Sequence, residues 1–141
     1  MGDYDGPTSG TYHGRTASWV YGQGSGYSTM TATFSADYQG SPRGQATLTI
    51  VGLDGDNPAK QPISIAVNGV TIYQGADPLP NDFCCGPSGP GNWGSATFQF
   101  SAGILGHNNM LSITNLADSS CTTCPVYVMV DYADLEFRVR Q

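Results

Sequence analysis

Apolar and polar side chains alternate along most of this chain. Over residues 29–36, methionine, alanine and phenylalanine alternate with threonine and serine. A period of two places one row of side chains in a core and the other in water, which is typical of a half-buried β-strand. The same reading predicts strands at residues 16–21, 45–52, 62–67, 70–73, 93–101, 110–115 and 125–139. No segment has the spacing of a long amphipathic helix, so the pattern predicts an all-β protein.

About eight such strands predict an antiparallel β-sandwich, or jelly roll, formed by one domain over residues 16–141. Residues 1–15 are predicted to be an N-terminal extension. Two of the strands are joined by Asn68-Gly69, a dipeptide whose positive φ angles suit the type I′ turn of a hairpin. A length of 141 residues is enough for one domain to bury its own core.

Alternate connections of an antiparallel sandwich lie at the same end, because the chain reverses direction at each one. One end, here called the rim, then receives the long connections, at residues 22–26, 53–61, 75–92 and 116–124. The other end receives residues 37–44, the tight turn at 68–69, and residues 102–108. Since the rim connections contain most of the acidic, amide and cysteine side chains of the loops, we expect the functional chemistry there.

Composition excludes several classes of partner. Only 11% of the residues are charged, the formal net charge is −6, and the five basic residues are scattered along the sequence. The sequence therefore lacks the basic patch that binds nucleic acid or anionic lipid. No apolar run has the roughly 18 residues of a transmembrane helix, and the N-terminus has no signal-peptide pattern. We expect a mature or excised extracellular domain that binds no nucleic acid and inserts into no membrane.

The last predicted strand carries one carboxylate on an otherwise apolar face. That face has Tyr127, Met129, Ala133, Leu135, Phe137 and Val139 by alternation, together with Asp131. A buried carboxylate requires a compensating partner. Three partners remain open: Arg15 or backbone N–H groups, a Ca²⁺ ion, which prefers oxygen ligands, or a bound ligand.

The order of several segments resembles the galactose-binding-like jelly-roll domains. Residues 128–137, which include Asp131-Tyr132, resemble the closing strand of that family, and residues 63–73 resemble its hairpin. Residues 92–98 and 106–113 resemble two further segments, so that the resemblance covers about residues 16–139. The family includes carbohydrate-binding modules of families 6 and 35, and most of its members bind sugars without catalysing a reaction.

The resemblance implies roles for two residues. In modules of families 6 and 35 an aromatic side chain after a glycine-rich loop stacks on a sugar ring, and Trp93 falls on this position. An Asp of the closing strand often helps to hold a structural Ca²⁺ ion, and Asp131 falls on that position. The sequence departs from the family pattern in two places: residues 15–21 lack the acidic pair of the first strand, and Met129 stands where a ligand-binding Asn is common.

Aromatic and polar residues of the rim suit a sugar site. Trp93 and Tyr21 offer flat apolar surfaces on which a pyranose ring stacks. The candidate hydrogen-bonding residues are Asp54, Asp56, Asn57, Asn81 and Asp82. The alternative readings are that Trp93 closes the core, and that the Asp and Asn residues are ordinary turn residues or the opening of a calcium loop.

Four cysteines, Cys84, Cys85, Cys121 and Cys124, fall in rim connections. In an extracellular domain they predict two disulfides, for which three pairings exist. We expect pairing across the two connections, because a bridge between adjacent cysteines is strained and leaves residues 75–92 untethered. A zinc ion bound by all four thiolates is the alternative.

Catalysis has little support, because His13 and His107 are predicted to lie far apart and no acid pair faces a common substrate. The sequence therefore predicts a non-catalytic carbohydrate-binding module that recognises a polysaccharide or cell-surface glycan at the rim. The alternative is a structural or adhesive domain that self-associates or binds protein partners. Val126, Val128 and Val130 support this alternative, because they are apolar and fall on the second face of the last strand.

Overall fold

The computed structural model describes residues 9–12, 15–24, 26–55, 60–81, 92–118 and 127–140. Within these ranges the chain forms strands and one short 3-10 helix, η1 (Ala102–Ile104). The strands are β1 (Ser9–Tyr12), β2 (Arg15–Tyr21), β3 (Thr29–Ser35), β4 (Ser41–Asp54), β5 (Pro62–Val67), β6 (Val70–Ala76), β7 (Gly94–Ser101), β8 (Asn108–Asn115) and β9 (Tyr127–Arg140). The described part of the chain has no helix long and apolar enough to cross a membrane.

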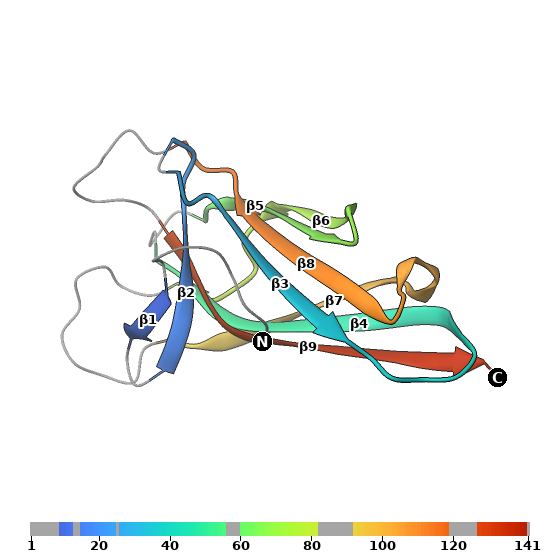
Figure 1. Ribbon diagram of the computed structural model, residues 1–141. Helices are drawn as coiled ribbons and strands as arrows, with labels where there is room; N and C mark the ends of the chain where they lie inside the picture. The colour runs from blue at the N-terminus through green and yellow to red at the C-terminus, as the bar shows by residue number, and fades with distance from the viewer. Residues whose placement is uncertain are drawn as a thin grey trace.

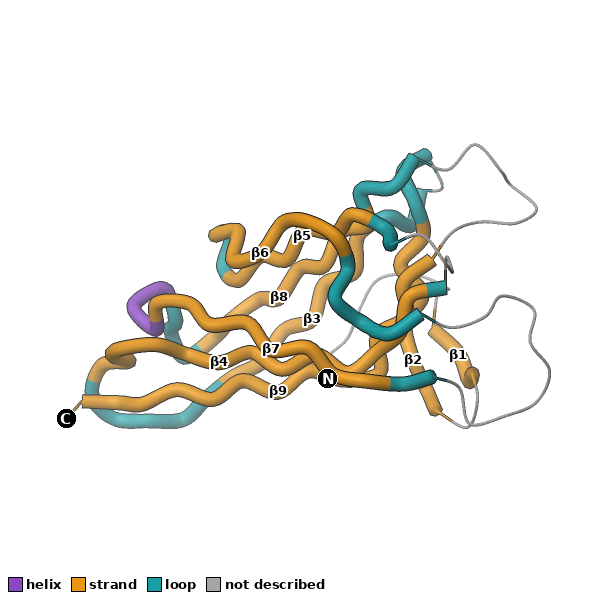
Figure 2. The backbone as a smooth tube through the Cα atoms, turned by 180° about the vertical axis from the view of Figure 1, so that it is seen from behind, coloured by secondary structure: helices purple, strands orange, loops and turns teal. Residues whose placement is uncertain are grey.

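Two antiparallel sheets pack face to face as a β-sandwich (Figure 1). One sheet has the strand order β1-β2-β9-β4-β7, and the other has the order β3-β8-β5-β6. Seen from behind in Figure 2, β5, β6 and β8 form a layer above β4, β7 and β9. The predicted class, an all-β antiparallel sandwich, is confirmed.

The structure begins its first sheet earlier than the sequence predicts. β1 lies within residues 1–15, the predicted extension, and pairs with β2 from Ser9↔Ser18 to Tyr12↔Arg15. It forms one edge of the five-stranded sheet and brings the described strands to nine. Because β1 has only four residues, its sequence carries too little alternation to be read as a strand.

The main core lies between the two sheets. Buried aliphatic and aromatic side chains from both inner faces meet there, among them Val20, Leu48, Ile65, Ile113 and Val128. Leu48 of β4 and Ile113 of β8 alternate with polar neighbours, as the sequence pattern predicts, whereas Val20 of β2 and Val128 of β9 have aromatic or apolar neighbours. Removing this apolar surface from water supplies the main favourable term of folding.

Backbone hydrogen bonds join the connections to one another at each end of the sandwich. This is expected, because alternate connections of an antiparallel sandwich lie at the same end. At the rim, bridges join Asp54 to Asn81 and Gln23 to Asp118. At the other end, the Ala36 N–H donates to the carbonyl of His107 at 2.9 Å. The described parts of the long connections therefore meet at one end of the sandwich.

The hairpin between β5 and β6 has the predicted turn. Asn68 and Gly69 have φ angles of 51° and 80°, both in the left-handed region that a type I′ turn requires. The Asn68 side chain also accepts a hydrogen bond from the Met110 N–H at 2.8 Å and donates to the carbonyl of Ile104 at 2.9 Å. The turn therefore anchors the neighbouring connection as well.

A β-bulge at Asp131 changes which side chains of β9 face the core. Val51 pairs with Tyr132 and Gly52 pairs with Val130, so Asp131 is an extra residue in β9. Val128 and Val130 before the bulge, and Leu135 and Phe137 after it, therefore all contribute to the main core. The prediction that Tyr127, Met129 and Asp131 share the core face with Leu135 is wrong, because uninterrupted alternation was assumed across the bulge.

Candidate functional site

A second, smaller apolar cluster lies on the outer face of the five-stranded sheet. Trp19 pairs with Met129 in the β2–β9 ladder, one residue away from the core pair Val20 and Val128. Successive side chains of a strand point to opposite faces, so Trp19 and Met129 point away from the main core. Ala17, Leu53 and Met129 are fully buried in this outer cluster.

Four aromatic side chains surround the outer cluster, and we call them the aromatic platform: Trp19, Tyr21, Trp93 and Tyr127. Each is half-buried. The rings of Tyr21 and Tyr127 meet edge to face, with centroids 6.4 Å apart and planes at 72°. Gly55 leaves room for Tyr127, since a Cβ atom at Gly55 would lie 2.5 Å from the Tyr127 ring.

Arg15 ties the platform to the bulge. Its guanidinium lies over the Trp93 ring, 5.2 Å from the centroid, and its Nη1 donates to Oδ2 of Asp131 at 2.8 Å. A cation over an indole face is attracted by the ring's quadrupole. Of the partners that the sequence leaves open for Asp131, the structure shows the ion pair with Arg15, which lies on the outer face rather than in the core.

The described surroundings of Asp131 do not fit the Ca²⁺ ion that the resemblance implies. The carboxylate already contacts the guanidinium of Arg15, and a second cation at that position would be repelled. In the ranges that the structure describes, no three histidine, cysteine or acidic side chains are grouped to hold a metal ion.

Asp54 is buried on the inner side of β4, where it pairs with the core residue Val128. Its side chain is fully inaccessible, and it accepts hydrogen bonds from the N–H and Nε2 of Gln61 at 3.1 and 2.8 Å. Gln61 also donates to the carbonyl of Tyr127 at 2.6 Å, and its Oε1 accepts from Nδ2 of Asn115. The predicted contact between Asp54 and a sugar is therefore not available in this structure, because the Asp54 carboxylate is buried and orients Gln61, which holds the backbone of Tyr127.

A second buried carboxylate, Asp77, lies beside Asp54. Its Oδ1 accepts a hydrogen bond from the Leu79 N–H at 2.9 Å. Burial raises the pKa of Asp77 to about 7, against the lowering effect of the Leu79 N–H, and the neighbouring Asp54 adds to the rise. The carboxyl group of Asp77 therefore holds its proton to a higher pH than an exposed carboxyl group does.

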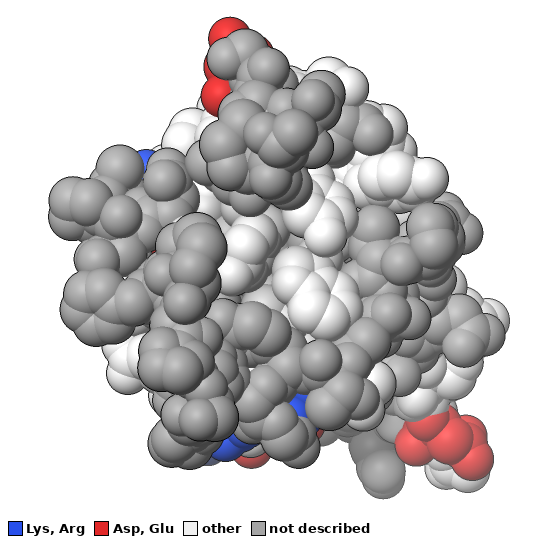
Figure 3. Space-filling view, turned by 90° about the vertical axis from the view of Figure 1, so that its left-hand side faces the viewer, with Lys and Arg blue, Asp and Glu red and all other residues white. Residues whose placement is uncertain are grey.

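The other predicted polar residues lie at or beyond the edge of the described structure. Asn81 is half-buried, and its carbonyl accepts a hydrogen bond from Nδ2 of Asn92 at 2.6 Å. Asp56, Asn57 and Asp82 lie outside the described residues, and so do Cys84, Cys85, Cys121 and Cys124. Their predicted roles, including the two disulfides, stay predictions. Figure 3 shows the rim end with mostly uncharged described residues at its centre.

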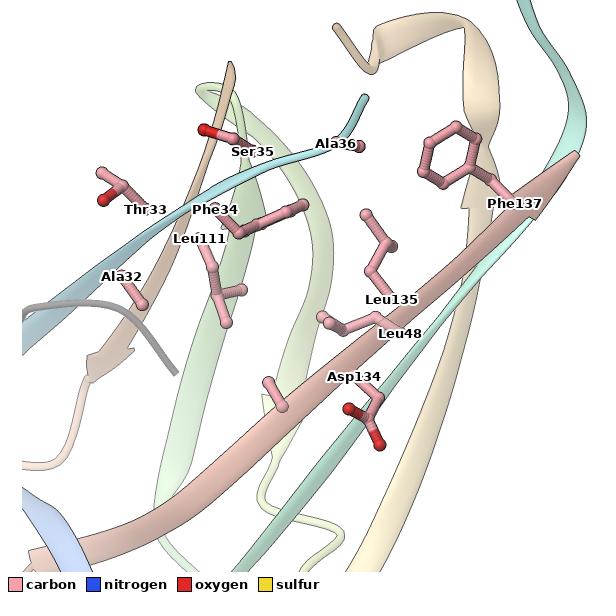
Figure 4. A pocket seen from close by; sticks show the side chains of 11 residues that line it. Ala32, Thr33, Phe34, Ser35, Ala36, Leu48, Leu111, Asp134, Leu135 and Phe137 are labelled. Carbon is pink, nitrogen blue, oxygen red and sulfur yellow. The ribbon is translucent and has the colours of Figure 1, made fainter. Parts of the chain in front are cut away.

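A hollow between the sheets offers a different kind of surface. This cavity of about 190 Å³ lies between β3 and β9, and Phe34, Leu135 and Phe137 point into it (Figure 4). Its lining is mainly the apolar edge of the main core. It has few fixed polar groups to orient sugar hydroxyls, so it fits a glycan less well than the platform does.

The platform residues that the sequence did not indicate are Trp19 and Tyr127. Uninterrupted alternation predicts the core face for Tyr127, whereas β9 with its bulge at Asp131 places it on the outer face. The sequence favours a core position for Trp19 too, but in β2 its pairing with Met129 places it on the outer face. Their sequence signal is their residue type, because both are large aromatic residues near the rim ends of their strands.

No protein-family model matches the sequence, and no curated protein matches it. Solved structures do match the fold, including a family 35 carbohydrate-binding module from Clostridium thermocellum, at 19% identity and a TM-score of 0.50. That match covers 94% of this chain and 80% of the other. A CBM4 structure matches at 11% identity and a TM-score of 0.55, covering 96% of this chain and 78% of the other.

A third similar structure is the CBM36-1 domain of a multidomain xylanase from the hindgut metagenome of Trinervitermes trinervoides. It matches at 15% identity and a TM-score of 0.50, covering 94% of this chain and 88% of the other. At these identities the likeness shows the fold. The chain therefore has the β-sandwich fold of these carbohydrate-binding modules, and the predicted resemblance is confirmed at that level.

Proposed function

We propose that this domain is a non-catalytic, extracellular carbohydrate-binding module whose binding surface is the aromatic platform. The observation that carries the proposal is the group of four half-buried aromatic side chains on the outer face beside the rim. The similar solved structures support it, because the three described above are named as carbohydrate-binding modules.

The platform has the properties that sugar recognition needs. Aromatic rings bind the C–H faces of pyranose rings with little loss of side-chain entropy when they are already fixed. Trp19, Trp93 and Tyr127 are fixed by the buried cluster beneath them, and Tyr127 is also held through its backbone by Gly55 and Gln61. Arg15 and Asp131 supply polar groups at the edge of the platform for sugar hydroxyls.

The test is binding to immobilised polysaccharides of plant, microbial and animal origin, measured by affinity electrophoresis and then by calorimetry. We expect at least one neutral polysaccharide to bind. Substituting Trp19→Ala or Trp93→Ala should weaken binding about tenfold or more, because each removes a stacking surface worth roughly 1–3 kcal/mol.

Tyr38→Ala is the matched control, since Tyr38 is also a half-buried aromatic residue but stacks on His107 at the opposite end, with centroids 4.2 Å apart. It should bind glycans like the wild type. The proposal fails if no glycan binds the wild type, or if Tyr38→Ala loses as much affinity as Trp93→Ala while all variants remain folded.

The structure removes the main reason for the alternative function. Val128 and Val130, taken from the sequence as an uncovered apolar face, are fully buried in the main core. Val126 lies outside the described residues. Self-association itself stays a prediction, and light scattering over a range of concentrations tests it.

A further inference from the structure

A polar cleft lies at the end of the five-stranded sheet opposite the platform. It has a volume of about 550 Å³, within the range of roughly 300–1,000 Å³ that small-molecule sites occupy. Its polar lining residues are Arg43, Gln45, Thr47, Gln99, Glu136 and Arg138. These come from β4, β7 and β9, three neighbouring strands of one rigid sheet.

Two arginines lie side by side in the lining of this cleft. Arg43 of β4 and Arg138 of β9 are direct partners in the antiparallel ladder, so their Cβ atoms lie on one face roughly 5 Å apart. Like charges directly opposite one another destabilise a sheet. Within the described residues neither arginine makes an ion pair or a side-chain hydrogen bond. Two guanidinium groups therefore point to solvent with their donors available.

The local charge differs from that of the whole chain. The net charge is −6 with five basic residues in all, yet Arg43, Arg138 and Arg140 come together at this end of the sheet. Glu136 is the acidic side chain in the cleft lining. A paired set of planar guanidinium groups matches the oxygen atoms of a carboxylate or sulfate, which it binds through two parallel N–H donors.

The backbone is irregular at this cleft. Arg43 pairs with Arg138 and Thr47 pairs with Glu136, so β4 contains two more residues than β9 between these two pairs. Gly44 supports this bulge with a φ angle of +69°. Bulges re-aim side chains and are frequent beside binding sites. In this protein Arg43 borders the bulge and Gln45 lies within it, and both line the cleft together with Thr47 of the regular ladder.

We propose that this cleft is a second binding site, separate from the aromatic platform, that takes the carboxylate or sulfate group of an acidic polysaccharide. Arg43 and Arg138 bind the anionic group, which removes their mutual repulsion. Gln45, Gln99 and Thr47 hydrogen-bond to neighbouring sugar hydroxyls. The polysaccharide part of this assignment rests on the proposed function, whereas the binding of an anionic group does not.

The test is calorimetry at low salt with polygalacturonate, which carries carboxylates, dextran sulfate, which carries sulfates, and neutral dextran. We expect at least one acidic polymer to bind in preference to neutral dextran. Comparing polygalacturonate with dextran sulfate then shows whether the cleft binds a carboxylate or a sulfate group. Arg43→Gln and Arg138→Gln should each weaken that binding about tenfold or more, as expected for hydrogen bonds to a charged group. Arg138→Lys should restore part of it, since it keeps the charge but loses the planar fork.

Lys60→Gln is the matched control, because it removes one exposed positive charge at the rim. It should bind acidic polymers like the wild type. The inference is overturned if neither acidic polymer binds, if Lys60→Gln weakens binding as much as Arg138→Gln does, or if single-stranded DNA of equal charge binds equally well. Failure of neutral glycans at the platform, with acidic binding that depends on Arg138, would reject the proposed function alone.

A thermal measurement gives a second readout. Arg138→Gln should raise the Tm of the free protein at low salt, because it removes the opposed charges, and the gain should shrink at about 1 M salt, where the Debye length is about 3 Å. The acidic polymer that binds should raise the Tm of the wild type and not that of Arg138→Gln. A lower Tm for Arg138→Gln at low salt would show that the arginine is structural and would overturn the inference.

Discussion

Asp77 shows how one buried residue can make the whole fold sensitive to pH. The carboxyl group is 1% exposed, and its pKa rises from 3.8 to about 7 through burial and the presence of Asp54. Between these two pH values the unfolded chain has released this proton and the folded protein still holds it. The contribution of Asp77 to stability therefore falls as pH rises from about 4 to about 7 and stays constant above that.

Asp77→Asn should remove this dependence. An amide keeps the acceptor for the Leu79 N–H and can donate to Asp54 at every pH. We expect the variant to be more stable than the wild type at pH 8, by on the order of a few kcal/mol, and similar to it at pH 4. Chemical denaturation at several pH values measures both.

Asp134→Asn is the control for this change, because Asp134 is an exposed carboxylate on β9. It should keep the pH profile of the wild type. If Asp77→Asn also keeps the pH profile of the wild type, the folded protein does not hold a proton on Asp77 near neutral pH.

At the residue scale, the sequence predicted the partners of Asp131 better than the location of Asp54. A lone carboxylate requires a partner, Arg15 is one of the three kinds that the sequence leaves open, and the structure shows the ion pair with Arg15. Asp54 was placed in an exposed turn because Asp-Gly is typical of turns. The structure continues β4 to Asp54 and buries its side chain against Gln61, a contact that the sequence pattern does not reveal.

At the element scale, alternation predicted the strands because each of the longer strands has one face in a core. It failed at β9, where one inserted residue places two successive runs of apolar side chains on the same face. A bulge leaves no clear mark in a single sequence, since Asp131 also fits a regular strand with one polar inward position. The predicted face, and with it the positions of Met129 and Tyr127, were wrong for this reason.

Deleting Asp131 should therefore leave the fold intact. Without it, Val130 and Tyr132 become consecutive residues opposite Gly52 and Val51, and the ladder becomes regular with the same side chains in the core. We expect the variant to unfold cooperatively on heating. Its free energy of unfolding should fall by roughly 1 kcal/mol, because the ion pair with Arg15 is removed.

The matched control is deletion of Ser112 from β8. The pairing of β8 with β3 and β5 is regular throughout, so losing one residue there turns either Leu111 or Ile113 out of the core. This deletion should abolish cooperative unfolding, as expected when a one-residue shift moves apolar side chains to the wrong face. If both deletions unfold the protein, Asp131 is a required part of β9 and not an inserted residue.

At the scale of the whole molecule, the aromatic platform and the polar cleft that contains Arg43 and Arg138 lie on the same face of one sheet. Leu53 beneath the platform and Arg43 in the cleft are both on β4, ten residues apart, or roughly 30 Å at about 3.3 Å per residue. Between them the outer positions of β4 and β9 include the hydroxyl groups of Thr47 and Thr49, the exposed ring of Tyr132 and the carboxylate of Asp134. One extended polysaccharide chain can therefore follow this face from the cleft to the platform.

This arrangement predicts that affinity depends on chain length. Once one site holds a long chain, the second contact is intramolecular, so an acidic polymer that spans both sites should bind about 10²-fold more tightly than a short oligosaccharide of the same repeat. Either Trp93→Ala or Arg138→Gln should remove this advantage, while only Arg138→Gln should weaken the short oligosaccharide. Calorimetry with a size series of one acidic polysaccharide measures the difference. If short and long chains bind with equal affinity per repeat unit, one chain cannot occupy both sites. The outer face between the sites is then not a path for the ligand.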